Sequence, residues 1–171
     1  MPFFEYNKRM IHFVDIDKRE DKSVGLPLLF IHGAGSSHFS WALQLVVFSK
    51  TNRCIAIDLS GHGKSEGNGE TSIDNGYAYE VAALVDHLEL QDFILIGHSM
   101  GGGVAMSYVL NPEFRSPKAL VLVDSSPELH LAKVVPGLLI EVVEETRRAD
   151  HPAFDEYAEK LNMKQYENAI Q

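Results

Sequence analysis

The sequence predicts an α/β fold in which helices pack against a mostly parallel β-sheet. Four short apolar runs do not alternate with polar residues, which is typical of strands buried on both faces of a parallel sheet. Helical patterns separate successive runs, as crossover connections between parallel strands require. Each run ends at glycine or polar residues, and ligands of such sheets bind beyond the carboxyl ends of the strands. The four runs are Leu28–Ile31, Cys54–Ile57, Phe93–Ile96 and Ala119–Val123.

Two more strands are expected near the N-terminus, over Phe3–Tyr6 and Met10–Ile16, because both segments mix aromatic and β-branched residues. Three helices are expected between the strands, where apolar residues recur at helical spacing. Ser72 is a suitable N-cap for the second of them. The expected helices cover Phe39–Phe48, 72–90 and Met100–Leu110.

The C-terminal part of the chain has a different pattern. Pro136 and Pro152 are expected to begin two amphipathic helices, over 136–149 and 152–168, and no buried strand is expected after Val123. The strand at 119–123 would then lie at the edge of the sheet although it is apolar on both faces. Native edge strands are usually short, charged or covered. The sequence therefore predicts self-association through the exposed strand 119–123.

Length and composition restrict the class of protein. The chain has 171 residues, of which 45% are hydrophobic and 23% charged, enough for one domain with a buried core. Its 24 acidic and 15 basic residues give a net charge of −9, which disfavours nucleic acids and anionic membranes as partners. No signal peptide and no run long enough to span a membrane are expected. The single cysteine allows no internal disulfide, and a cytoplasmic location is expected.

The third apolar run leads into the motif G-x-S-x-G, formed by Gly97-His98-Ser99-Met100-Gly101. A sharp turn from a strand into a helix would lift the Ser99 hydroxyl above the sheet, and the two glycines would avoid collisions there. The Met100 N–H would then point to the position of a developing oxyanion. The alternative is a glycine-rich turn in which Ser99 is an ordinary N-cap.

The first apolar run leads into His32-Gly33-Ala34-Gly35. Such a loop is expected to supply a second oxyanion donor, here the Ala34 N–H. The alternative is a dinucleotide-binding loop with Asp58 as the acid that binds the ribose. That pattern needs glycine or alanine where this chain has His38.

The second apolar run is followed by Asp58-Leu-Ser-Gly-His-Gly-Lys-Ser, whose last three residues resemble the end of a phosphate-binding loop. The full phosphate-binding pattern needs glycine at the position of Asp58, so that interpretation fails. A tight turn in which the Asp58 side chain binds local backbone groups is the alternative.

Together the segments HGAGSS, DLSGHGKS and GHSMGG resemble the α/β-hydrolase family in order and spacing, from about Phe3 to Asp124. The resemblance implies a serine-nucleophile member of that family, with His32, Gly33, Gly97 and Gly101 as motif residues. Members with this nucleophile include esterases, lipases, thioesterases, lactonases, carbon–carbon hydrolases, cofactor-free haloperoxidases and some lyases.

The chain also departs from the family pattern. The family sheet has eight strands, with a catalytic acid after the seventh and a histidine after the eighth. The last two strands are not found here. The resemblance therefore implies the N-terminal part of a hydrolase core over 1–125, followed by an incomplete helical cap segment over 126–171.

Several residues could replace the missing catalytic groups. Asp124 ends the sixth expected strand, where some family members carry their acid, so it is the tentative acid; the alternative is a side chain that caps the next turn. His130 and His151 are candidate bases if either reaches Ser99. The His98 side chain is expected to pack beside the sheet.

No cofactor or metal is expected. His12, His38, His62 and His87 show no ligand spacing along the chain. Cys54 lies within an apolar run and is expected to be a core residue.

The main functional hypothesis is a serine hydrolase that acts on a carboxylic ester or a related small carbonyl compound through an acyl-enzyme at Ser99. The alternative is a non-catalytic remnant of the fold that binds a ligand or partner. A nucleotide-binding α/β domain is a third hypothesis. The activity of the 171-residue chain alone is expected to be low.

Overall fold

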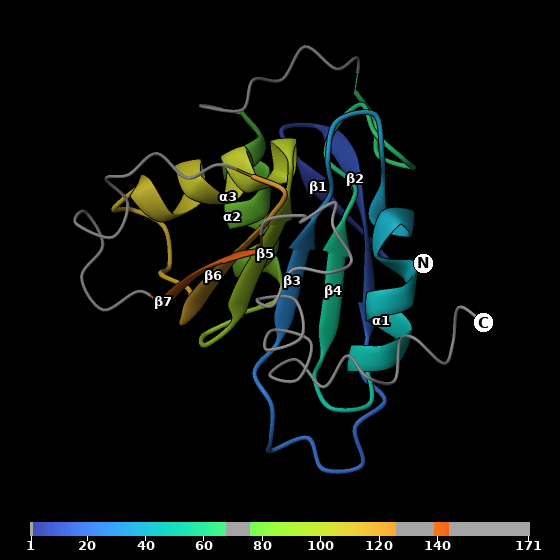
Figure 1. Ribbon diagram of the computed structural model, residues 1–171. Helices are drawn as coiled ribbons and strands as arrows, with labels where there is room; N and C mark the ends of the chain where they lie inside the picture. The colour runs from blue at the N-terminus through green and yellow to red at the C-terminus, as the bar shows by residue number, and fades with distance from the viewer. Residues whose placement is uncertain (1, 68–75, 126–138, 144–171) are drawn as a thin grey trace, which may run out of the picture.

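The computed structural model describes residues 2–67, 76–125 and 139–143. These residues form a seven-stranded sheet in the order β1-β2-β4-β3-β5-β6-β7, with helices on both faces (Figure 1). β2 pairs antiparallel with β1 on one side and with β4 on the other, and all other neighbouring strands are parallel. The strands are β1 (Phe3–Tyr6), β2 (Arg9–Ile16), β3 (Leu28–Ile31), β4 (Cys54–Ile57), β5 (Ile94–His98), β6 (Ala119–Val123) and β7 (Leu139–Val143).

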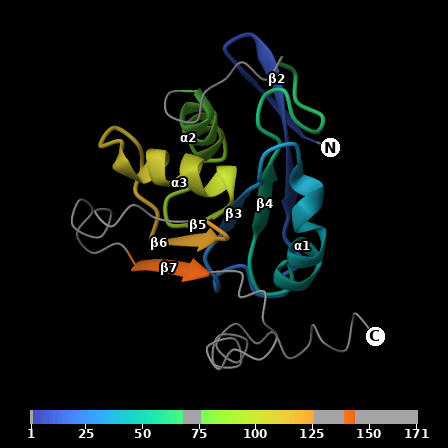
Figure 2. The same cartoon turned by 45° about the horizontal axis from the view of Figure 1, so that its top comes forward.

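The helices lie on opposite sides of the sheet. α1 covers one face, whereas α2 and α3 cover the other, as the tilted view in Figure 2 shows. Successive residues of β3 divide between these faces: Leu28 and Phe30 pack with the α1 side, and Leu29 and Ile31 pack with α2 and α3. The helical elements are the 3-10 helix η1 (His38–Trp41), α1 (Ala42–Phe48), α2 (Ala78–His87) and α3 (Met100–Leu110).

The structure confirms the six strands predicted from the apolar and β-branched runs, with end shifts of one residue in β2 and of one and two residues in β5. The helix predicted over Phe39–Phe48 begins instead as η1, which the Ser37 side chain caps by accepting a hydrogen bond from the Phe39 N–H. The predicted N-cap Ser72 lies outside the described residues. None of the helices in the described segments is long and apolar enough to cross a membrane.

The predicted helix over 136–149 is wrong at its centre, because Leu139–Val143 forms strand β7. β7 pairs in parallel with β6 from Ala119 to Val123, so β6 has a neighbour on each side. The expectation that 119–123 is an exposed edge is therefore also wrong, and self-association through that strand loses its basis. A segment rich in β-branched and apolar residues fits a strand as well as a helix, and pairing with β6 satisfies backbone groups of both strands. The segment 152–168 lies outside the described residues.

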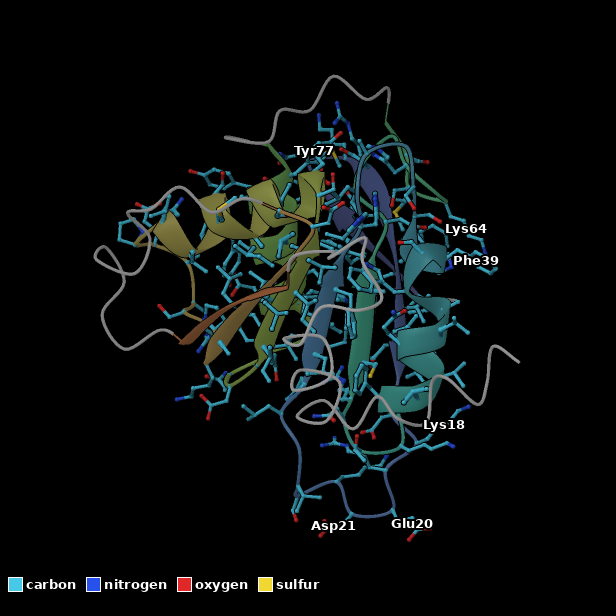
Figure 3. All side chains as sticks on the ribbon, in the orientation of Figure 1. Lys18, Glu20, Asp21, Phe39, Lys64 and Tyr77 are labelled. Carbon is cyan, nitrogen blue, oxygen red and sulfur yellow. The ribbon has the colours of Figure 1, made fainter. Side chains whose placement is uncertain are left out.

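The parallel strands place the candidate site at one end of the molecule. Tyr77 and Phe39 lie towards the carboxyl ends of β3, β4 and β5, whereas Lys18, Glu20 and Asp21 lie on the loop at the opposite end (Figure 3). The loops that follow β3, β4 and β5 therefore meet at the end where ligands of such sheets bind.

Pairing of β6 on both sides predicts slow hydrogen exchange of the amides at 119–123. We expect these amides to exchange much more slowly than those of β1, which among the described strands pairs only with β2 and is the matched control. Mass spectrometry or NMR of the native chain measures both strands at once. Exchange of β6 as fast as that of β1 would contradict the arrangement.

Candidate active site

Ser99 occupies a strained turn between β5 and α3. Its backbone has φ 51° and ψ −117°, outside the regions that residues with side chains normally adopt. A side chain on Gly97 would collide with the backbone of Gly101, and one on Gly101 would collide with the Ile31 carbonyl of β3. The strand–turn–helix context that the G-x-S-x-G motif requires is thus present.

The end of β6 holds this turn from a second side. The Ser99 N–H donates to the Val123 carbonyl at 3.0 Å. The Ser125 hydroxyl is 2.9 Å from the Ser99 carbonyl oxygen and 3.2 Å from that of Val123, so it can donate to either. Asp124, which lies between Val123 and Ser125 in the chain, has φ 48°, a conformation rare for residues other than glycine. Sequence reasoning missed Ser125, whose role depends on β6 lying next to β5.

The loop after β3 lies against Ser99 and is oriented by His32. A Cβ on Gly33 would lie 3.0 Å from His98 Nδ1 and 3.4 Å from Ser99 Cβ. His32 Nδ1 donates to the Gly33 carbonyl at 2.8 Å, while its Nε2 accepts from the Leu59 N–H at 3.2 Å. Burial lowers the pKa of His32, which favours the neutral ring that these two bonds require. Because the Gly33 carbonyl and the Ala34 N–H belong to one planar peptide group, His32 also fixes the direction of that N–H.

Asp58 is a fully buried carboxylate at the end of β4 that receives hydrogen bonds from three segments. His12 Nδ1 is 2.8 Å from Oδ2, and His38 binds Oδ1 through both its backbone N–H and its Nδ1, at 2.6 and 2.9 Å. The Lys64 N–H donates to Oδ2 at 3.0 Å. Burial opposes ionisation, but the hydrogen bonds from the His38 and Lys64 N–H groups outweigh it and hold the pKa of Asp58 below its usual value.

This cluster confirms that the Asp58 side chain binds local backbone, through the Lys64 N–H, and shows that its role extends beyond a tight turn. Its carboxylate binds the local Lys64 N–H but also side chains 46 and 20 residues away, and it is enclosed rather than open to a ribose. β4 lies between β2 and β3 in the sheet, which brings His12 and His38 to the same carboxylate. His12, His38 and Asp58 therefore form a group whose ligand atoms all lie within 4.8 Å of one another, although their spacing along the chain gives no sign of a metal site.

Glu80 is a second buried carboxylate, and it joins α2 to the loop after β4. It accepts hydrogen bonds from the Ser60 N–H at 2.9 Å and from the Ser60 hydroxyl. Burial raises the pKa of Glu80 despite these bonds. The sequence carried a signal for this position, because Glu80 is three residues after Tyr77 and four before Leu84 and so shares their buried helix face.

The other candidate residues divide into three groups. Asp124 is half-exposed, and its carboxylate lies 4.0 Å from Nε2 of His98, whose ring packs edge-on against Trp41. His130 and His151 lie outside the described residues. Cys54 is buried, and burial raises its pKa to about 12, as expected for a core residue.

Residues 28–167 match the model of a family described as the alpha/beta hydrolase family. The chain belongs to the alpha/beta hydrolase family. Among the described residues, the mixed sheet and its flanking helices agree with this assignment.

Individual members of the alpha/beta hydrolase family are also similar to this chain. A non-heme chloroperoxidase of Streptomyces lividans is 38% identical over 128 residues, which cover 73% of this chain and 46% of that protein. A bifunctional esterase/perhydrolase of Acinetobacter calcoaceticus is 33% identical and is covered over 43% of its length. The structure of a thermophilic esterase from Thermogutta terrifontis has 30% identity and a TM-score of 0.61, with 73% of this chain and 44% of that one covered. The chain thus spans less than half the length of these relatives.

The raised pKa of Glu80 predicts a pH-dependent effect of Glu80→Gln. Because the folded state favours protonated Glu80, its contribution to stability is complete below the ordinary pKa of 4.5 and is lost as pH rises through the folded value. Glutamine stays neutral, can accept from the Ser60 N–H and can donate to its hydroxyl. We therefore expect the variant to gain stability relative to the native chain as pH rises above 4.5.

Urea unfolding at several pH values measures this difference. The control is Glu113→Gln, which removes a carboxylate from an exposed residue. A difference between Glu80→Gln and the native chain that stays constant with pH, or that moves in the opposite direction, would show that folding does not raise the pKa of Glu80.

Proposed function

We propose that this chain carries the nucleophile of a serine hydrolase, which acts on a carboxylic ester or a related small carbonyl compound through an acyl-enzyme at Ser99. The observation that supports this most strongly is the backbone conformation of Ser99, which has a φ of 51°. The residue lies in the turn between a strand and a helix, and close backbone contacts at the flanking glycines hold that turn. Strained residues of this kind concentrate at functional sites. The esterase and the bifunctional esterase/perhydrolase among the relatives support an ester as the substrate class.

In this mechanism the Ser99 hydroxyl attacks the substrate carbonyl carbon, and a base takes its proton. The Ala34 and Met100 N–H groups would bind the negative oxygen of the tetrahedral intermediate. Collapse of that intermediate breaks the bond to the alcohol, which leaves with a proton, and the serine remains acylated. Water then attacks the acyl-enzyme in the same way and releases the acid.

The base and its acid are the incomplete part of this proposal. Within the described residues no histidine hydrogen-bonds to the Ser99 hydroxyl. We retain Asp124 as the tentative acid, although its carboxylate lies 4.0 Å from Nε2 of His98, which does not hydrogen-bond to the Ser99 hydroxyl. Because an unassisted hydroxyl is a weak nucleophile, we expect the 171-residue chain alone to hydrolyse esters slowly.

The surroundings of the reaction follow from composition. A net charge of −9 supports a small-molecule substrate rather than a nucleic acid. The buried, unpaired Cys54 supports a cytoplasmic location. We place the hydrolase core over 1–125 and a cap segment over 126–171, with β7 pairing from that segment onto the core sheet.

A fluorophosphonate probe tests Ser99 directly. We expect slow covalent labelling of the native 171-residue chain at Ser99, because oriented oxyanion donors retain part of the catalysis without a complete triad. Ser99→Ala should fold normally and lose the label, whereas the control Ser107→Ala, on the same helix, should keep it. Intact mass and peptide mapping locate the label.

Two outcomes of that experiment would contradict the assignment. Labelling that persists in Ser99→Ala would place the nucleophile elsewhere. Labelling of the native chain no faster than that of the urea-unfolded chain would favour a non-catalytic member of the fold that binds a ligand.

A further inference from the structure

We propose that His12, His38 and Asp58 form a binding site for one divalent transition-metal ion of the zinc type, separate from Ser99. Each residue offers one ligand atom, and the three atoms lie within 4.8 Å of one another. Two imidazoles and one carboxylate are a ligand set that zinc and its neighbours in the first transition row accept. The proposal does not depend on the proposed hydrolase activity.

The geometry requires only a small change to admit an ion. His12 Nδ1 lies 2.8 Å from Asp58 Oδ2, and His38 Nδ1 lies 2.9 and 3.0 Å from the two carboxylate oxygens. Ligand atoms about 2.0–2.2 Å from a tetrahedral zinc ion are separated by roughly 3.3–3.5 Å. Both rings therefore already direct Nδ1 towards the position that an ion would share with the carboxylate.

A metal ion bound to His12 Nδ1 would replace the hydrogen bond between that atom and Asp58. In the structure Nδ1–H donates to Asp58, whereas binding of a metal to Nδ1 requires the ring proton to be on Nε2. His12 Nε2 is buried and has no hydrogen-bond partner, so no bond at Nε2 opposes the transfer of the ring proton to it. The His12 and Phe3 rings meet in an edge-to-face arrangement at a centroid distance of 5.0 Å.

The carboxylate is held by groups that can serve as a second shell. The His38 and Lys64 N–H groups donate to Asp58 at 2.6 and 3.0 Å and can keep it oriented when a metal replaces the imidazole protons. A side chain on Gly63 would collide with the same carboxylate, so that face of Asp58 is closed. His12 and Asp58 are fully buried, but the His38 side chain is 17% exposed and gives a route of entry.

An ion at this position would connect three separate segments. His12 lies on β2, His38 begins η1 after the loop that contains Gly33 and Ala34, and Asp58 follows β4. The metal would therefore fix the loop that lies against Ser99 to the centre of the sheet. Its role would be to hold these three segments together, because His12 and Asp58 are fully buried and the ligands come from separate elements.

Titration of the chelator-treated chain with Zn²⁺ and Co²⁺ tests the proposal. We expect one equivalent of Zn²⁺ to bind by calorimetry and to raise the melting temperature, and Co²⁺ to give the visible absorption of low-coordinate cobalt. His38→Gln, at the partly exposed ligand, should lower affinity by about tenfold or more. His12→Gln and Asp58→Asn should do the same.

The controls separate this site from other histidines. The double variant His130→Gln/His151→Gln and the single variant His62→Gln should bind Zn²⁺ like the native chain. If Asp58→Asn does not fold, His38→Gln decides alone. No binding at about 100 μM Zn²⁺, unchanged affinity in His38→Gln, or loss of binding in the controls would each overturn the proposal and leave a hydrogen-bonded cluster only.

Discussion

The close approach of α3 to three neighbouring strands is the constraint on which the rest of this structure depends. The first turn of α3 lies against the Ile31 carbonyl in β3, against Gly97 in β5 and against Ser125 after β6. A side chain at Gly97, Gly101 or Gly102 would collide with these neighbours, so only glycine allows the close approach. The chain must then turn within the one residue that joins β5 to α3. Ser99 is that residue, and its positive φ costs about 1–3 kcal/mol that the surrounding contacts must offset.

A second set of interactions fixes the loops around that turn. His32, Asp58 and Glu80 are buried polar side chains, and each binds backbone groups of the loop after β4. A buried polar group is costly when it has no partner, so these side chains strongly restrict the paths of the loops that they bind. The loop after β3 is thereby held against Ser99, at the end of the sheet where ligands bind. In this way η1, α2 and the sheet all contribute to one site although none of them carries the proposed nucleophile.

The sequence predicted most of the sheet because strands buried on both faces must be short and apolar. Leu28–Ile31 and Ala119–Val123 were located to the residue for that reason. Leu139–Val143 was assigned to a helix because its apolar residues fit both periods, and pairing with β6 decides between them. The cluster around Asp58 could not be predicted, because His12 and His38 meet there only when β4 lies between β2 and β3. Glu80 could have been found from its place on the apolar face of α2.

The stability of Gly97→Ala compared with Gly35→Ala tests most directly whether backbone contacts hold the Ser99 turn. A Cβ on Gly97 would collide with Gly101, whereas a Cβ on Gly35 has no atom within 4 Å and meets only the strain of φ +65°. Urea unfolding should show a loss of about 1 kcal/mol for Gly35→Ala. For Gly97→Ala the loss should exceed about 2 kcal/mol, up to failure to fold. Equal losses in the two variants would contradict the account, since the turn could then relax without the glycine contacts.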